Sequence, residues 1–108
     1  FRRVLFRSGY DEELFNKNFL EKNITFDFII DDGPHSLESM CVFIDLYTKV
    51  LTEDGVLIIE DVQSIDWIKI LKNVTPEPLK KHIKVYDRRD VKGRYDDILF
   101  VIDKRSLV

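Results

Sequence analysis

Two short apolar segments, separated by one segment with helical periodicity, constrain the fold more than any other feature of the chain. Residues 26–30 and 56–59 are apolar except at Asp27, as in strands that are buried on both faces of a parallel sheet. Between them, apolar residues recur every three or four positions over residues 36–51, behind a serine that can cap a helix. Residues 52–55 are expected to form the turn before the second strand. This order predicts a parallel strand pair joined by a right-handed crossover.

The flanking segments extend this unit on both sides. Residues 11–22 and 66–74 have amphipathic periodicity and are expected to be helices, with one more helical turn at residues 79–81. Residues 83–87 and 98–102 are strand candidates, and the direct polar loop between them favours antiparallel pairing. We therefore predict an α/β fold, a Rossmann-like, mostly parallel sheet with helices on both faces and a C-terminal antiparallel strand pair.

The composition of the chain limits which classes of partner and which cellular compartment suit it. The chain has 108 residues, 44% of them hydrophobic, which suits one globular domain. A formal net charge of −3 gives no basic footprint for nucleic acid, and no apolar run approaches the roughly 20 residues that span a bilayer. We therefore expect neither nucleic acid nor a membrane as a partner, and leave the oligomeric state open. Cys41 is the single cysteine, which suits a reducing, cytoplasmic compartment.

The N-terminal residues differ in character from the rest of the chain. Residues 1–10 hold three arginines among apolar residues and have no helix cap. Two origins suit this segment equally, an edge strand of the sheet or non-native sequence joined to the chain. We assign it no function.

Acidic residues and a histidine follow the two apolar strands. Asp31, Asp32 and His35 come after the first strand, and Glu60 and Asp61 come after the second. In open α/β sheets, ligands bind beyond the carboxyl ends of the strands, and neighbouring strands lie only about 4.8 Å apart. Four carboxylates at one edge are costly unless a cation or hydrogen-bond donors compensate them. Because oxygen ligands suit Mg²⁺, and the sequence has no cysteine pair or histidine cluster to favour zinc, the acids indicate a magnesium site.

Strand alternation separates the roles of the first two acids. Asp31 and Asp32 start on opposite faces, so one is expected to bind metal while the other holds the turn or faces a second ligand. His35 can accept a proton near neutral pH, and its position beside the acids favours a general base over an inert surface histidine. Ordinary turn and cap chemistry is the alternative for the acids. The basic residues of loop 88–97 are expected to be solvated, with contact to an anionic substrate as the alternative.

The segments DDGPH and IIEDV, one after each apolar strand, resemble the DDGSH and IED motifs of class I S-adenosylmethionine (SAM)-dependent methyltransferases. The nearest subgroup is the metal-dependent O-methyltransferases that modify macrolide sugars. The resemblance implies that Asp32, Glu60 and Asp61 bind Mg²⁺ and that His35 is the general base. It further implies that Asp31 lies near SAM.

The same resemblance places the chain within a larger domain. The family binds SAM through a Gly-rich loop after its first strand, whereas this sequence has four glycines and no GxG. By the resemblance, the strands of this chain correspond to the fourth to seventh of a seven-stranded sheet. Residues 11–108 are therefore expected to be the C-terminal part of a methyltransferase domain.

The implied function is methyl transfer from SAM to a hydroxyl group of a small molecule or sugar, with Mg²⁺ lowering the pKa of that hydroxyl. Two alternatives stay open. One is a non-catalytic fragment or binding module with the same fold. The other is a Mg²⁺-dependent hydrolase or sugar-nucleotide enzyme that uses the same acids.

Overall fold

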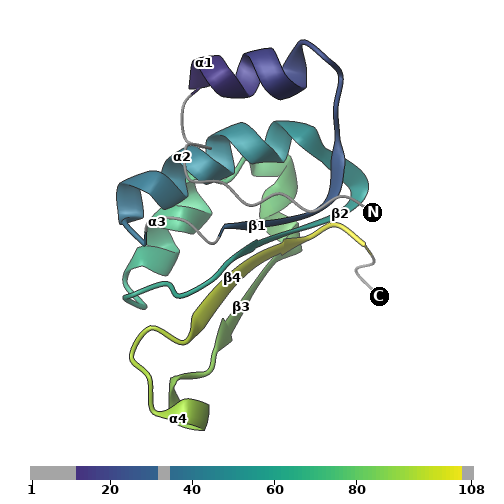
Figure 1. The fold of residues 1–108 in the computed structure, drawn as a ribbon. Helices are drawn as coiled ribbons and strands as arrows, with labels where there is room; N and C mark the ends of the chain where they lie inside the picture. Colours follow the sequence, from purple (N-terminus) through teal and green to yellow (C-terminus); the bar gives the residue numbers. More distant parts are fainter. Residues whose placement is uncertain (1–11, 32–34, 106–108) are drawn as a thin grey trace.

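The structure, a computed structural model, describes residues 12–31 and 35–105. Helices and strands follow each other in the predicted order, with one short extra helix in the last loop (Figure 1). The helical elements are α1 (Glu12–Phe15), η1 (Asn16–Leu20), α2 (Leu37–Tyr47), η2 (Thr48–Val50), α3 (Trp67–Val74), η3 (Glu77–His82) and α4 (Arg89–Lys92). The strands are β1 (Phe26–Asp31), β2 (Leu51–Ile59), β3 (Ile83–Asp87) and β4 (Ile98–Asp103).

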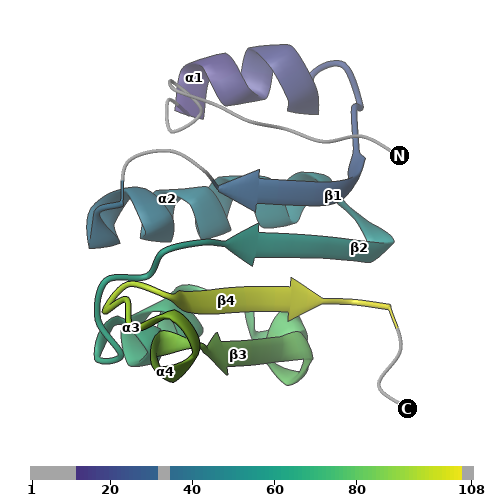
Figure 2. The ribbon, with the colours of Figure 1, turned by 60° about the horizontal axis from the view of Figure 1, so that its bottom comes forward.

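The described strands form one mixed sheet in the order β1-β2-β4-β3. β1 and β2 are parallel, and β4 is antiparallel to both of its neighbours, β2 and β3. Strand β3 therefore points in the same direction as β1 and β2, as the arrowheads in Figure 2 show. The predicted α/β fold, with its C-terminal antiparallel pair, is confirmed.

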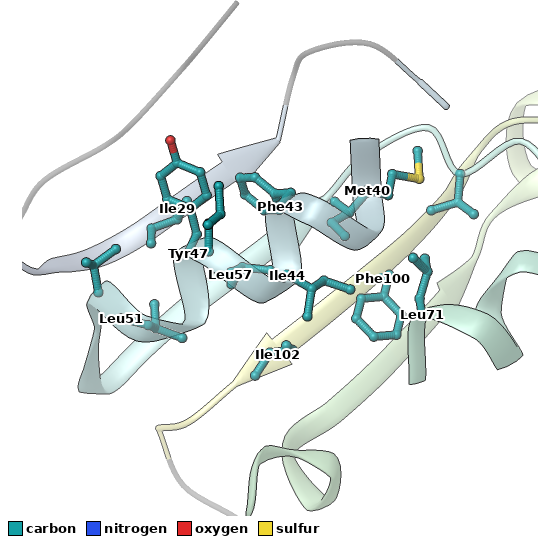
Figure 3. Close-up of a cluster of buried hydrophobic side chains, with 14 of the residues drawn as sticks. Ile29, Met40, Phe43, Ile44, Tyr47, Leu51, Leu57, Leu71, Phe100 and Ile102 are labelled. Carbon is teal, nitrogen blue, oxygen red and sulfur yellow. The ribbon is translucent and has the colours of Figure 1, made fainter. Parts of the chain in front are cut away.

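Helices α2 and α3 pack side by side over one face of the sheet, and the core lies between them and the strands (Figure 3). The residues that fill this layer are almost completely buried: Ile29, Met40, Ile44, Leu57, Leu71, Phe100 and Ile102. The sequence indicated helices on both faces of the sheet, whereas α2 and α3 lie on the same face. The chain moves in the same direction across the sheet from β1 to β2 and from β2 to β3, so two right-handed crossovers place both helices on the same side.

Helix α2 begins where the sequence predicted. The Oγ atom of Ser36 accepts a hydrogen bond from the backbone N–H of Ser39 at 3.1 Å, which satisfies one free donor of the first turn. The predicted end near residue 51 is too late. The last turn tightens into η2, and Leu51 pairs with Phe26 as the first residue of β2.

An aromatic cluster ties the N-terminal helix to the rest of the fold. Phe15 of α1 and Tyr47 of α2 meet edge to face with their ring centroids 4.9 Å apart, and Phe19 meets Phe26 in the same way at 5.3 Å. The predicted helix at residues 11–22 is confirmed from residue 12 to residue 20, although its second half is a π-helical turn. Residue 11 lies outside the described residues.

The predicted turn at residues 52–55 is wrong, because these residues belong to β2. Phe26 pairs with Leu51, but two residues later Phe28 pairs with Val56, so β2 accommodates three extra residues in a bulge. Thr52 Oγ1 donates to Asp27 Oδ1 at 2.8 Å across this bulge. The polar and glycine residues that suggested a chain reversal therefore bend the strand instead.

The C-terminal half agrees with its predicted elements. Helix α3, the extra helical turn η3 and the strands β3 and β4 all lie within one or two residues of their expected bounds. The loop between β3 and β4 contains α4, which ends at Gly93 with φ of +67°. Backbone of Arg88 and Asp97 closes the base of this loop, since the N–H of Arg88 donates to the Asp97 carbonyl at 2.8 Å.

Candidate functional site

The carboxyl ends of β1 and β2 meet at one edge of the sheet, as the sequence predicted. Asp31 is the last residue of β1 and pairs with Ile59, the last residue of β2. Asp31 is only 4% exposed, and strand alternation places it on the face of Ile29, which packs beneath α2. Burial, and then the negative charge of Asp31, raise the pKa of Tyr47 well above its usual value. The first acid therefore lies buried at the carboxyl edge of the sheet, on the face that α2 covers.

His35 and Asp61 face each other across this edge. His35 Nε2 lies 3.8 Å from Asp61 Oδ2, and each side chain is about one-third exposed, at 33% and 30%. His35 lies between β1 and the Ser36 cap, whereas Asp61 lies two residues beyond the end of β2. The structure thus brings together one residue from each predicted motif.

Backbone geometry at the end of β2 directs Asp61 toward this position. Asp61 has φ of +55°, a left-handed conformation that is uncommon for a residue other than glycine. The next residue, Val62, is fully buried, and its N–H donates to the Ile98 carbonyl at 3.1 Å. The sequence missed this conformation; the signal was an Asp, which tolerates φ above zero better than most residues, directly after a buried strand.

The two remaining candidates for metal binding contribute less to the described site. Glu60 directly follows β2 and is partly buried. Asp32 lies outside the described residues. Within residues 12–31 and 35–105, no three histidine, cysteine or acidic side chains are grouped so that they could hold a metal ion. The described residues therefore give no support to Mg²⁺.

The loop between β3 and β4 lies at the same edge of the sheet (Figure 2). Because β3 runs parallel to β1 and β2, the loop that leaves its carboxyl end emerges beside their carboxyl ends. Val91 and Tyr95 of this loop are each 68% exposed, and Tyr86 at its start is 47% exposed. The basic residues of this loop were recognised in the sequence, whereas its large exposed side chains were not.

No protein-family model and no curated protein matches the chain. The sheet and helices nevertheless share their fold with a solved structure.

A solved structure with this fold is the M1.HpyAVI–SAM complex, with a TM-score of 0.53 and 20% sequence identity. The match covers 97% of this chain and 57% of that chain. Another structure of M1.HpyAVI gives a TM-score of 0.49 and 20% identity, and covers 94% of this chain and 54% of that one. The chain therefore spans little more than half the length of these neighbours.

This neighbour corrects the predicted partners. M1.HpyAVI is a SAM-dependent DNA methyltransferase, which contradicts the expectation of a small-molecule or sugar substrate and of no contact with nucleic acid. It also gives no support to the macrolide-sugar subgroup. The expectation rested on a net charge of −3, which sums over the whole surface, whereas contact with phosphates depends on where individual cations lie.

No helix within residues 12–31 and 35–105 has the length and apolar character needed to cross a bilayer. The cytoplasmic location inferred from the single cysteine stays a prediction.

Proposed function

We propose that residues 11–108 form the C-terminal part of a SAM-dependent methyltransferase domain that acts on nucleic acid. The observation that carries this proposal is the fold, since the β1-β2-β4-β3 sheet and its helices match the M1.HpyAVI–SAM complex over 97% of this chain. The edge that holds His35 and Asp61 is the side on which open α/β sheets bind ligands. We place the methyl-transfer site there.

His35 is the proposed general base at this site. When bound, SAM supplies a methyl group on a positively charged sulfur. The lone pair of the acceptor atom forms a bond to the methyl carbon while the carbon–sulfur bond breaks and its electron pair stays on sulfur. The proton that the acceptor loses passes to the imidazole of His35. The carboxylate of Asp61, 3.8 Å from His35 Nε2, stabilises the resulting imidazolium.

Asp31 remains the proposed residue on the cofactor side. It ends β1 at the ligand edge, and an ionised carboxylate offers hydrogen-bond acceptors only, which suits the hydroxyl groups of a ribose. Asp31→Asn keeps the size of the side chain and exchanges one acceptor for a donor. We expect it to weaken binding of S-adenosylhomocysteine, measured by calorimetry, and equal affinity would exclude the role.

Magnesium is not assigned a step in this reaction. Asp61, one of its predicted ligands, faces His35, and Asp32 lies outside the described residues. Glu60 and Asp61 are the described residues that an ion at this edge would contact. Calorimetry with Mg²⁺ on the wild type and on Glu60→Gln tests them, and equal affinity in the two proteins would exclude Glu60 as a ligand.

The experiment for the whole proposal measures transfer of a labelled methyl group from SAM to single-stranded and duplex DNA and RNA. We expect labelled nucleic acid with the wild type, and a loss of at least tenfold in rate with His35→Ala. His82→Ala is the matched control, because His82 lies at the end of η3 away from this edge. Labelled product from the His35→Ala protein at the wild-type rate would exclude His35 as the base.

A non-catalytic module with the same fold is the second candidate. The observation that favours it is the coverage of 57% of the M1.HpyAVI chain, because residues outside this part of the fold can contribute to the SAM site. Calorimetry with S-adenosylhomocysteine separates the two candidates. Binding supports the methyltransferase, whereas the module is supported if neither this chain nor a version extended to the length of the M1.HpyAVI fold binds S-adenosylhomocysteine.

A further inference from the structure

Tyr86, near the end of β3, and the loop that follows it combine exposed aromatic rings with arginines at the edge that holds His35 and Asp61. Eight large hydrophobic side chains of the described residues are exposed, and three of them, Tyr86, Val91 and Tyr95, lie within this ten-residue stretch. Exposing such side chains has an unfavourable hydration cost, so their concentration at the end of β3 and in the loop after it favours a binding role.

The loop is folded rather than an open coil. The side chain of Arg89 donates two hydrogen bonds to the carboxylate of Asp87, at 2.8 and 2.7 Å. The N–H of Gly93 donates to the Arg89 carbonyl at 3.0 Å and ends the short helix α4. A preorganised loop loses less conformational entropy when it binds a partner, so these contacts favour recognition by the loop in its observed shape.

Two arginines of the loop are paired with acidic side chains, and a third is not. Arg89 is paired with Asp87, and Arg94 Nε lies 3.5 Å from Asp96 Oδ1. Arg88 is exposed and takes part in no ion pair within the described part of the chain. It is therefore available to a phosphate, and it stands two positions after Tyr86.

The pattern suits nucleic acid better than a protein partner. Charged residues separate the exposed side chains along the chain, so they do not form the continuous apolar patch expected of a stable protein interface. Tyr95 instead follows Arg94 directly, and Tyr86 lies two positions before Arg88. Aromatic rings close to arginines can stack unpaired bases while the cations contact the backbone. A base that is modified by an enzyme must also leave its stack, which exposes neighbouring bases as well.

We propose that this loop binds a single-stranded segment of nucleic acid beside the methyl-transfer site. A base stacks on Tyr95, a second contact is made by Tyr86, and Arg88 binds a backbone phosphate. This inference rests on the proposed function for its substrate class, but the loop itself can be tested without SAM.

The test measures binding of a fluorescently labelled 12-nucleotide single strand, and of the matching duplex, by anisotropy at two salt concentrations. We expect tighter binding of the single strand. Tyr95→Ala should weaken it by about 5- to 150-fold, the equivalent of one stacked base, whereas Tyr95→Phe should retain most of the affinity. Arg88→Ala should weaken binding and reduce its salt dependence. Lys72→Ala, an exposed change on α3, is the control and should bind as the wild type does.

The outcomes separate this inference from the proposed function. Single-strand binding that Tyr95→Ala and Arg88→Ala leave unchanged would overturn the inference, whereas methyl transfer to nucleic acid by the wild type would still support the function. Loop-dependent binding of the single strand by a protein that does not transfer methyl groups would support the loop and not the function. Stronger binding of the duplex would also overturn the inference.

Discussion

His35 Nε2 and Asp61 Oδ2 lie 3.8 Å apart, and this approach joins the ends of two parallel strands. The two residues come from different motifs, one before α2 and one after β2. Asp61 reaches this position with φ of +55°, a backbone conformation that costs free energy in most residues. The carboxylate and the conformation can therefore be tested separately.

Asp61→Gly and Asp61→Asn separate these two properties. Glycine relieves the left-handed conformation but adds entropy to the unfolded chain, so we expect the free energy of unfolding to change by less than about 1 kcal/mol. Both variants remove the negative charge beside His35, so both should lower methyl transfer. Urea denaturation and the transfer rate are the measurements. A Gly variant with the wild-type transfer rate would show that the carboxylate is dispensable.

Leu71 and Ile70 are neighbours on α3 with opposite environments. Leu71 is completely buried against the sheet, whereas Ile70 is 43% exposed. Leu71→Ala removes packed atoms and leaves a cavity, so it should lower the free energy of unfolding by about 2–5 kcal/mol. Ile70→Ala is the matched control and should change it by no more than about 0.5 kcal/mol. Equal effects of the two substitutions would contradict the observed packing of α3.

The Ser36 cap can be tested in the same way. Ser36→Ala removes the acceptor for the Ser39 N–H and should cost about 1 kcal/mol of stability. Ser36→Asp retains an acceptor oxygen and should keep most of the stability. Thermal unfolding followed by circular dichroism measures both. If the alanine and aspartate variants unfold at the same temperature, the cap contributes nothing.

The lowered pKa of Asp103 predicts how the free energy of unfolding depends on pH. Two side-chain hydrogen bonds from Arg105, at 3.0 and 2.8 Å, hold the pKa of Asp103 far below its usual value, with a further bond from Lys84 at 3.3 Å. A lowered pKa in the folded state means that the stabilisation is fully present above about pH 4, the pKa in the unfolded chain. It is lost as the pH falls from there toward the folded-state pKa.

We therefore expect Asp103→Asn to be less stable than the wild type at pH 7 and to lose less stability between pH 5 and pH 2. Melting temperatures of the two proteins over this range are the measurement. Asp87→Asn is the control, because its ion pair with Arg89 is solvent-exposed and should contribute little. Parallel pH profiles for the wild type and Asp103→Asn would contradict the prediction.

Sequence periodicity predicted elements better than it predicted local backbone geometry. The apolar runs around Ile29 and Leu57 indicate buried strands because short runs bounded by turn residues are typical of a parallel sheet interior. The left-handed Asp61 could not be predicted, since an Asp after a strand suits several turn conformations equally. Its carboxylate lies 3.8 Å from His35 in that conformation. The motif sequence therefore located the site but not its geometry.

The expectation that the chain does not contact nucleic acid was wrong for a different physical reason. A net charge of −3 argues against a basic surface, but it carries no information on Tyr86 at the end of β3 or Tyr95 in the next loop, each of which is exposed and close in sequence to an arginine. Stacking on Tyr95 would need no excess of positive charge. Only the direction of β3, fixed by its pairing with β4, places this loop at the edge of His35.

Gly55 is the residue on which the bulge in β2 depends. A Cβ atom at this position would lie 2.5 Å from Leu51 Cδ1 and 3.0 Å from the Thr52 carbonyl oxygen, in a buried part of the strand. Gly55→Ala should therefore cost about 1–3 kcal/mol of stability, as overpacked core substitutions do. Leu51→Ala together with Gly55→Ala removes the clashing side chain, so the two substitutions should be less than additive in urea denaturation. Additive losses would show that the bulge does not bring Leu51 against Gly55.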